Sequence, residues 1–332
     1  MIFVALFIFL LFSCEPSDAP RITLFAGTAM TMHYRIMVGK VLTSKEKSRV
    51  KTLIHETFSD INDGVNKWNP QSELSRLNRA KAGESLPLSS ELAQFLKETA
   101  QMVWLSEGRF DPTIEPLYRL WKTQLEKGRI PSSEEIQRAA AAIGWEKIHF
   151  EENRFWKDHG AVQLDFGGIA KGYAIDLLTE RLREKGYDDI YVEWGGEIRT
   201  SGEHPEGRPW RVLVSKFGSL DVHYSLAVVD LQDEAIATSG DYVQNWVVDG
   251  ITYYHLIDPA AHRPLISGSN TVCSVTVVAP TCMLADALAT SAMMFPTPET
   301  TKEWLERQKK IIPALKYWVV SRSSKTGFAG SR

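Results

Sequence analysis

The segment Leu164–Asp176, LDFGGIAKGYAID, decides how the rest of this chain is interpreted. We expect a short strand to end at Asp165, the two glycines to form a tight turn, and a helix to run from Ala170 to Lys185. The N–H groups at the start of such a helix favour a phosphate, and Lys171 in its first turn would add a positive charge. The Walker A spacing is absent, so a plain turn with a solvated lysine stays open as an alternative.

Around this segment, helices come first along the chain and strands crowd its middle, without strict alternation of the two. Apolar spacing predicts helices over 44–68, 90–106, 284–295 and 299–309, and a capping box of Ser132 and Glu135 begins another helix that ends at Ala142. Strands are predicted within 21–38 and over 189–193, 210–214, 225–229, 252–257, 272–279 and 315–320. This order favours an α+β fold over a doubly wound parallel sheet.

The composition is that of a globular protein. The chain has 332 residues, of which 44% are hydrophobic, and this excludes a disordered or fibrous protein. Its 38 Lys and Arg against 41 Asp and Glu give a net charge of −3, which argues against nucleic acid as a partner because phosphate backbones need a basic excess. Three cysteines are too few for a disulfide scaffold. We expect Cys273 and Cys282 to be partly buried free thiols, with a disulfide between them as the alternative.

The first residues differ from the rest of the chain. Residues 1–12, MIFVALFIFLLF, are too short to span a bilayer but have the length of a secretory signal. Leu11-Phe12-Ser13-Cys14 resembles a bacterial lipobox, so we expect cleavage before Cys14 and lipid attachment to it. Because no Lys or Arg precedes the run, an uncleaved anchor or a misassigned start stays open. The predicted boundaries are a signal peptide at 1–13, a lipidated tether at 14–20, a catalytic domain at 21–325 and a tail at 326–332.

Two residues of the predicted helix over 284–295 have metal-binding chemistry. Asp286 and Thr290 are four positions apart, so they project from the same helix face. A carboxylate and a hydroxyl are hard oxygen ligands suited to Mg²⁺, which usually shares phosphate oxygens. The alternative is an acidic residue near a helix start followed by a threonine bonded back to the helix.

Three further positions offer chemistry that is not specific when taken alone. His255, at the expected end of a strand, is a candidate general base or a hydrogen-bonded structural histidine. Trp68, at the end of the first long helix, could stack on an aromatic ligand or cap a core. Thr238-Ser239-Gly240 offers hydroxyls in what we expect to be a flexible turn.

The order of these segments is much more specific than any one of them. From about Phe25 to Val320 the chain resembles the ApbE-type flavin transferases, which are FAD:protein FMN transferases. The matching segments, in family order, are GTAM (27–30), NPQSELSRLN (69–78), EGRFDPTIEPLYRLW (107–121), LDFGGIAKGYAID (164–176), WGGEIRTSG (194–202), ATSGDY (237–242), HLIDP (255–259) and VTVVAPTCMLADALAT (275–290). The resemblance implies an ApbE-like α+β domain with a mixed, largely antiparallel sheet, flanking helices and an active site in a cleft between two subregions.

The resemblance also implies a reaction: Mg²⁺-dependent transfer of FMN from FAD to a Thr or Ser hydroxyl of a client protein, with release of AMP. Mg²⁺ would lie between Asp286, Thr290 and the backbone carbonyl of Gly168, and would neutralise charge on the pyrophosphate. His255 would take the hydroxyl proton. The residues that would line the flavin and nucleotide site are Met30, Trp68, Arg109, Phe110, Asp111, Asp165, Lys171, Thr238 and Ser239.

The sequence departs from the family pattern at three points. Thr31-Met32 stands where Gly-Thr usually follows GTAM, and Trp68 stands where the family has tyrosine. The usual Asp-Pro-x-Thr-Gly turn is Asp258-Pro-Ala-Ala-His262, so we expect that loop to be reshaped. Two alternative functions stay open: a FAD pyrophosphatase that gives FMN and AMP, and a non-catalytic flavin-binding lipoprotein.

Family members are often periplasmic lipoproteins, which agrees with Cys14. We therefore expect a lipid-anchored protein on the periplasmic side of a bacterial cell envelope, at the inner membrane rather than the outer. The resemblance implies clients among subunits of Rnf-type complexes or sodium-translocating NADH:quinone reductases.

Overall fold

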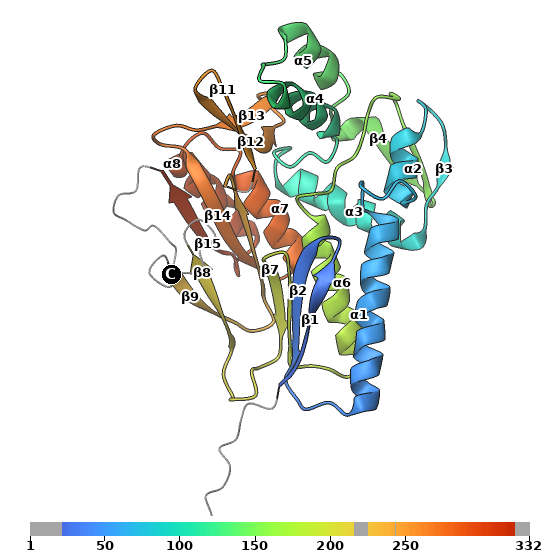
Figure 1. The fold of residues 1–332 in the computed structure, drawn as a ribbon, viewed down its shortest axis with the longest axis vertical. Helices are drawn as coiled ribbons and strands as arrows, with labels where there is room; N and C mark the ends of the chain where they lie inside the picture. The colour runs from blue at the N-terminus through green and yellow to red at the C-terminus, as the bar shows by residue number, and fades with distance from the viewer. Residues whose placement is uncertain (1–21, 216–224, 243, 323–332) are drawn as a thin grey trace, which may run out of the picture.

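The computed structural model describes residues 22–215, 225–242 and 244–322, and it is built around a seven-stranded sheet (Figure 1). The strand order is β1-β2-β6-β7-β10-β14-β15, and every neighbouring pair in it is antiparallel. The strands span Thr23–Ala29 (β1), Met32–Val38 (β2), Ile190–Trp194 (β6), Glu197–Ser201 (β7), Ala235–Gly240 (β10), Val272–Ala279 (β14) and Lys316–Ser321 (β15).

Helices α6 (Ala170–Glu184) and α7 (Cys282–Ala292) pack on one face of this sheet. Helix α1 (Ser44–Gly64) lies outside α6, and its buried stripe includes Val50, Ile54 and Phe58. All eight residues of β14 are buried, because the strand is covered on both faces. The other helices on this side are α2 (Glu73–Arg79), α3 (Ser90–Leu105) and α8 (Pro298–Ile311).

A two-stranded hairpin covers the opposite face of the sheet. Its strands are β8 (Trp210–Ser215) and β9 (Ser225–Leu231). Alternate residues of β8, such as Trp210 and Val212, are buried against Tyr191 and Ile198 of the sheet. This alternation is the period of two expected for a strand with one buried face.

A second subregion lies above one end of the sheet (Figure 1). It contains α4 (Glu115–Glu126), α5 (Ser133–Ala140) and a sheet of β11 (Asn245–Val248), β12 (Ile251–Asp258) and β13 (Arg263–Ile266). These elements share their own apolar cluster, which includes Trp121 and Tyr253. A small sheet of β3 (Leu86–Pro87), β5 (Arg154–Lys157) and β4 (Ile148–Glu151) and a 3-10 turn at Trp145–Lys147 complete the described fold.

The α+β architecture agrees with the sequence prediction, with differences at particular elements. The first long helix ends at Gly64, so Trp68 lies beyond it. The capping box of Ser132 and Glu135 is present at the start of α5. Cys273 and Cys282 form no disulfide with each other, as expected, and both are fully buried where we expected partial burial. Helix α4 and strand β10 were not predicted.

Several predictions fall on the N- and C-terminal ends of the chain. The signal peptide, Cys14, the tether and the tail at 326–332 lie outside the described residues. Within the part of the chain that the structure describes, no helix is long and apolar enough to cross a membrane.

Candidate active site

A cavity of about 1450 Å³ lies where the two subregions meet. The seven-stranded sheet and the helices packed on it form one wall of the cavity. Residues of α4, of β12 and of the end of α1 contribute to the other wall. Every residue within the described range that the sequence singled out for flavin, metal or proton chemistry lines this cavity: Met30, Trp68, Arg109, Phe110, Asp111, Asp165, Gly168, Lys171, Thr238, Ser239, His255, Asp286 and Thr290. The fold thus brings together residues that are more than 200 positions apart in the sequence.

Three ionisable side chains form what we name the cavity cluster: Lys171, which is half-buried, and Glu197 and Asp286, which are buried. The Nζ of Lys171, in the first turn of α6, lies 3.2 Å from Glu197 Oε1 and 3.6 Å from Asp286 Oδ2. Burial raises the pKa of both carboxyl groups, since it penalises their charged forms. Burial alone would lower the pKa of Lys171, but its two carboxylate neighbours raise it, so the lysine stays charged. Lys171 therefore holds positive charge at the cavity wall.

The pairing inside the cavity cluster is incomplete. Glu197 Oε2 is buried and has no hydrogen-bond partner among the described residues. Asp286 Oδ2 accepts the backbone N–H of Gly172 at 3.2 Å. A buried polar atom left without a partner is costly and indicates a place for a ligand, ion or water. Glu197 was not identified from the sequence, although it follows two glycines in a quoted segment.

The oxygen atoms around Thr290 fit a magnesium ion. Asp286 and Thr290 share the cavity face of α7, as their spacing predicts. The backbone of Gly168 lies so close that an added Cβ would be 3.1 Å from Thr290 Oγ1. Ser239 Oγ is also 3.0 Å from that oxygen. Within the described ranges no group of three or more His, Cys, Asp or Glu could hold a metal by itself, so a bound Mg²⁺ would take further oxygens from phosphate and water.

The turn before α6 has the predicted tight shape but no strand in front of it. Only an isolated parallel bridge joins Gln163 to Ile114. Asp165 accepts the backbone N–H of Gly167 at 2.8 Å through Oδ1, which closes the turn. The φ of Gly168 lies outside the left-handed region, so its backbone conformation does not call for glycine. The absence of a Cβ instead leaves room for the close approach of Thr290.

His255 lies in the middle of β12 and not at a strand end, because that strand continues to Asp258. Its Nδ1 is 3.3 Å from the carbonyl oxygen of Gln244. A proton on Nδ1 would donate to that oxygen and leave Nε2 as the acceptor. Burial lowers the pKa of His255, which keeps the ring neutral and able to accept a proton at neutral pH.

Trp68 does not cap a core, because 71% of its surface is exposed. It lines the cavity, with the Nζ of Lys67 at 5.0 Å and that of Lys122 at 5.7 Å from its ring centroid. These contacts lie within cation–π range and hold the indole in place while leaving surface free for stacking.

Lys67 was not identified from the sequence, and it joins three parts of the cavity wall. Its Nζ lies 2.7 Å from Glu115 Oε2 and 2.7 Å from Asp165 Oδ2. Burial alone would lower the pKa of Lys67, but the two carboxylates raise it. Lys67 and Asp165 are 98 positions apart, so no local pattern could have revealed the pair.

Thr238 and Ser239 lie in strand β10, not in the flexible turn that we expected. Their side chains point to opposite faces of the sheet, as alternate strand residues do. Thr238 Oγ1 is 2.8 Å from Thr276 Oγ1, whereas Ser239 contacts Thr290.

The segment of Arg109, Phe110 and Asp111 forms another part of the wall. The Arg109 guanidinium lies 3.8 Å from the ring centroid of Phe295. Asp111 Oδ1 accepts both the backbone N–H and the hydroxyl of Thr113, at 2.9 Å and 2.6 Å. Burial raises the pKa of Asp111. The carboxylate thus shapes the turn in addition to lining the cavity.

Two of the departures from the family pattern fall on backbone in the left-handed region. Met30 and Thr31 form the two-residue turn between β1 and β2, with φ of 45° and 69°. His262, where the family has glycine, has φ of 54°. Asp258 Oδ1 accepts the N–H groups of Ala260 and Ala261, so the turn after β12 closes on the aspartate. His262 therefore holds a backbone conformation that glycine adopts freely.

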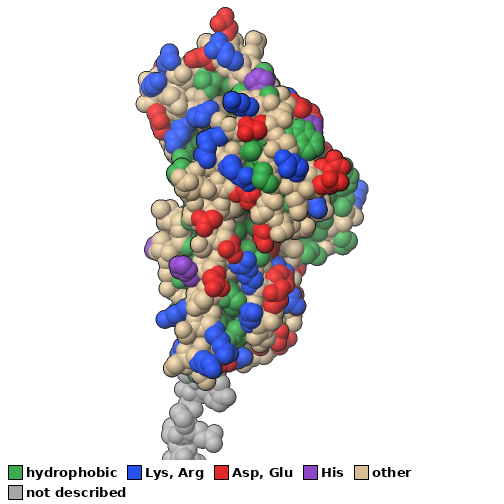
Figure 2. Space-filling model, turned by 90° about the vertical axis from the view of Figure 1, so that its right-hand side faces the viewer, with side chains coloured by type: hydrophobic (Ala, Val, Ile, Leu, Met, Phe, Trp, Pro, Cys, Tyr) green, Lys and Arg blue, Asp and Glu red, His purple; other side chains and the backbone are tan. Residues whose placement is uncertain are grey.

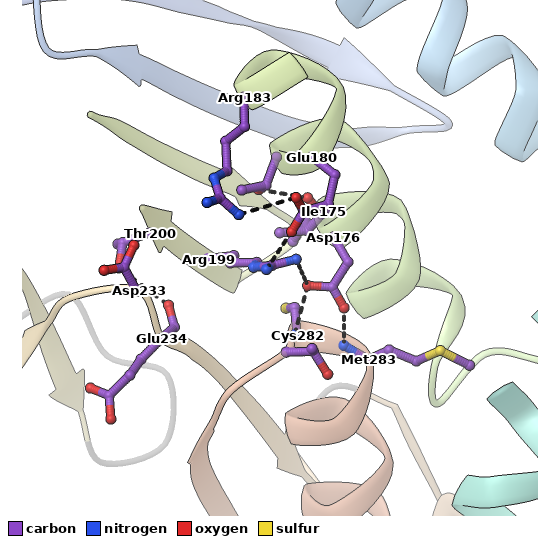
Figure 3. A network of polar contacts seen from close by, with 12 residues as sticks. Ile175, Asp176, Glu180, Arg183, Arg199, Thr200, Asp233, Glu234, Cys282 and Met283 are labelled. Carbon is purple, nitrogen blue, oxygen red and sulfur yellow. Dashed lines mark hydrogen bonds and ion pairs between the residues drawn. The ribbon is translucent and has the colours of Figure 1, made fainter. Parts of the chain in front are cut away.

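A second set of charges, which we name the anchor cluster, consists of Asp176, Glu180 and Arg199 (Figure 3). Arg199 donates to Asp176 Oδ1 at 2.9 Å and to Glu180 Oε1 at 2.6 Å. Asp176 also accepts the N–H groups of Cys282 and Met283, each at 2.8 Å, at the start of α7. The anchor cluster thereby fixes α7, which carries Asp286, against α6 and β7.

Charged side chains of both signs lie on the face of the molecule that Figure 2 shows. On the face shown in Figure 2, Lys and Arg side chains are interspersed with Asp and Glu, and no extended area of positive charge is present there. This distribution agrees with the near-balanced composition.

Comparisons with known proteins agree with this fold. A sequence model described as the ApbE family matches residues 27–315. A FAD:protein FMN transferase of Chlamydia pneumoniae is 40% identical over 87% of this chain and 90% of that protein, and one of Vibrio cholerae is 34% identical over 86% and 84%. The solved flavin transferase ApbE from Vibrio cholerae superposes with a TM-score of 0.77 at 30% identity over 94% of this chain and 96% of its own. The apo flavinyl transferase ApbE of Pseudomonas stutzeri gives 0.79 at 28% identity over 94% of both chains. This chain therefore belongs to the ApbE family.

Proposed function

We propose that this chain transfers FMN from FAD to a Thr or Ser hydroxyl of a client protein. The hydroxyl oxygen forms a bond to the phosphorus on the riboflavin side, the pyrophosphate P–O bond breaks, and AMP leaves with the bridging oxygen. The hydroxyl proton is released. The observation that carries the proposal is the cavity cluster beside Thr290, in a cavity large enough for a dinucleotide, in a chain whose relatives are named FAD:protein FMN transferases.

The oxygens of Asp286 and Thr290 and the backbone of Gly168 would hold Mg²⁺, a donor set that fits this ion. The bound ion would supply Lewis-acid stabilisation of the pyrophosphate. Lys171 adds a fixed positive charge at the same place, because its neighbours keep it protonated. Together these groups favour the charge that develops on the departing AMP.

The remaining residues bind and orient the substrates. Trp68 offers its exposed face to the isoalloxazine ring, and Met30, Arg109, Phe110 and Asp111 complete that wall. The Asp165 turn approaches the pyrophosphate, and Ser239 together with Thr238 approaches the nucleotide. His255 takes the hydroxyl proton through Nε2, which is the nitrogen that its contact with Gln244 leaves free.

The protein's location is a further part of the proposal. We infer from the apolar run and the lipobox-like sequence that Cys14 carries lipid and anchors the catalytic domain on the periplasmic side of the inner membrane. Membrane redox subunits of the Rnf type or of sodium-translocating NADH:quinone reductases are the clients to test first.

The test is an incubation of the protein with FAD, Mg²⁺ and a client subunit, with AMP and protein-linked flavin both measured. We expect a fluorescent client band that survives denaturing electrophoresis, and equimolar AMP. Chelation of Mg²⁺ should abolish both. Release of FMN and AMP without a client band would instead identify a pyrophosphatase, and FAD bound without AMP release would identify a flavin-binding protein.

A further inference from the structure

Strand β10 continues past the end of its neighbour on one side. It pairs with β14 along its whole length, from Ala235 to Gly240. With β7 it pairs only at Ala235 and Ile236, because the β6–β7 hairpin turns back at its two glycines. The last four residues of β10, 237–240, therefore have a strand neighbour on one side only.

The direction of the free backbone groups follows from the ladder. Asp241 donates its N–H to Cys273 O at 3.0 Å, so Asp241 directs its backbone groups toward β14. In an antiparallel ladder this direction alternates from residue to residue. Thr238 and Gly240 thus direct their N–H and C=O groups away from β14, toward the open side. Among the described residues, no hydrogen bond is made to these groups.

This open edge faces the cavity. Thr238, Ser239 and Gly240 all line it, and the hydroxyl of Ser239 is 3.0 Å from Thr290 Oγ1. Proteins usually cover or blunt a strand edge, because its unpaired groups recruit another strand. Thr238 and Gly240, whose backbone N–H and C=O groups are unpaired within the described ranges, are separated by Ser239 alone. This is the spacing that pairing with an added strand requires.

We propose that the client segment carrying the acceptor hydroxyl binds as an added β-strand on residues 238–240. This inference rests on the proposed transfer to a protein hydroxyl. Strand addition gives affinity through backbone groups, so it suits an enzyme that takes its substrate as an extended peptide. The open edge of β10 lines the same cavity as Asp286 and Thr290, where the client hydroxyl has to arrive.

The register of such a strand explains how the hydroxyl reaches the phosphorus. Residues directly opposite each other on neighbouring strands project from the same face of a sheet. A Thr or Ser opposite Ser239 would therefore point toward Thr290 and Asp286. The residues on either side of it would point to the other face, which carries Thr238 and Thr276.

The experiment uses the purified full chain, FAD, Mg²⁺ and a library of synthetic nonapeptides that each contain one central threonine. Peptides that gain covalent flavin are then remade with a single N-methyl group at each backbone amide in turn. We expect kcat/KM to fall about tenfold or more at alternate positions around the threonine and to change little at the positions between, because only alternate amides face β10. The sensitive positions include either the threonine itself or the residues on either side of it. Either pattern supports the added strand, and which one is observed shows whether the strand is parallel or antiparallel to β10.

Residue-resolved hydrogen exchange provides a second measurement. FAD with Mg²⁺ should leave the Thr238 and Gly240 amides exchanging, and a labelled peptide should slow both about tenfold or more. N-methyl sensitivity without a period of two, or full protection of both amides by FAD alone, would overturn the inference and would assign this edge to the nucleotide. Absence of covalent flavin on every peptide would contradict the proposed transfer as well.

Discussion

The cavity cluster and the anchor cluster both connect α6, β7 and α7, yet they differ in how completely their polar atoms are paired. In the anchor cluster, both oxygens of Asp176 accept backbone N–H groups, and Arg199 bonds two carboxylates. In the cavity cluster, the contacts of Lys171 are 3.2 Å and 3.6 Å long, and one oxygen of Glu197 has no partner among the described residues.

This difference in pairing indicates that the anchor cluster has a structural role and the cavity cluster a ligand-binding role. A set of charges whose polar atoms are paired contributes to holding α7 in place, whereas a set with an unpaired polar atom has room for a ligand. Burial raises the pKa of carboxyl groups in both clusters, and it raises that of Asp176 to about 6 despite the nearby Arg199. The comparison leads to predictions that begin with the largest effect.

Asp286→Asn should have the largest effect on the reaction. It removes a charged oxygen from the proposed metal site while conserving shape, so we expect transfer to fall by about 10³-fold. The free energy of unfolding should change by less than about 1 kcal/mol, because Lys171 keeps Glu197 as a partner. Covalent flavin on a client and urea unfolding measure the two quantities. Full activity in this variant would remove Asp286 from the metal site.

Asp176→Ala should have the opposite profile. It leaves two N–H groups of α7 without their acceptor and removes one of the two carboxylates that Arg199 contacts, so we expect the free energy of unfolding to fall by about 3–5 kcal/mol. Asp176→Asn, which keeps one acceptor oxygen, should lose less. Urea titration checks both variants. If Asp176→Ala lost transfer activity but kept its unfolding midpoint, the anchor cluster would have a role in the reaction and not in stability.

His255→Gln tests the proton acceptor. We expect kcat to fall by about 10²-fold while FAD still binds. Because burial lowers the pKa of His255, the ring stays neutral further into the acid range, and the acid limb of kcat/KM should have its midpoint below about 6.5. That limb should disappear in the variant. Wild-type turnover, or an acid limb that persists, would rule out the base role.

Thr31→Gly should have the smallest effect, a change in the free energy of unfolding that comes from relief of backbone strain. Thr31 holds φ of 69°, which is strained for a β-branched side chain, whereas glycine adopts it freely. We expect a gain of about 1 kcal/mol in the free energy of unfolding, and a smaller gain for Thr31→Ala, which keeps a Cβ. Thermal unfolding of the pair measures the difference. A destabilised glycine variant would contradict the strain.

Local patterns in the sequence predicted much of this structure. The buried run of β14, the apolar stripe of α1 and the capping box of α5 all lie where spacing placed them. Strand β10 was missed because its Thr, Ser and Gly favour turns, and residues 237–240 are part of the strand because β14 pairs with them. Tertiary packing thus overrode the local propensity.

The candidate site divides in the same way. Asp286 and Thr290 were identified because they are four positions apart on one predicted helix, and Lys171 because it follows a glycine-rich turn. Lys67 and Glu197 were not found, since their partners come from distant parts of the chain. The partners of a buried charge depend on the folded arrangement, which no short motif contains.

The central claim is that the cavity transfers FMN to a protein hydroxyl. The most direct measurement is the intact mass of a client subunit after incubation with this protein, FAD and Mg²⁺, alongside the amount of AMP released. The account predicts a client heavier by one FMN less one water, one AMP for each modified client, and neither product with Asp286→Asn. AMP and free FMN in equal amounts, with the client mass unchanged, would contradict it.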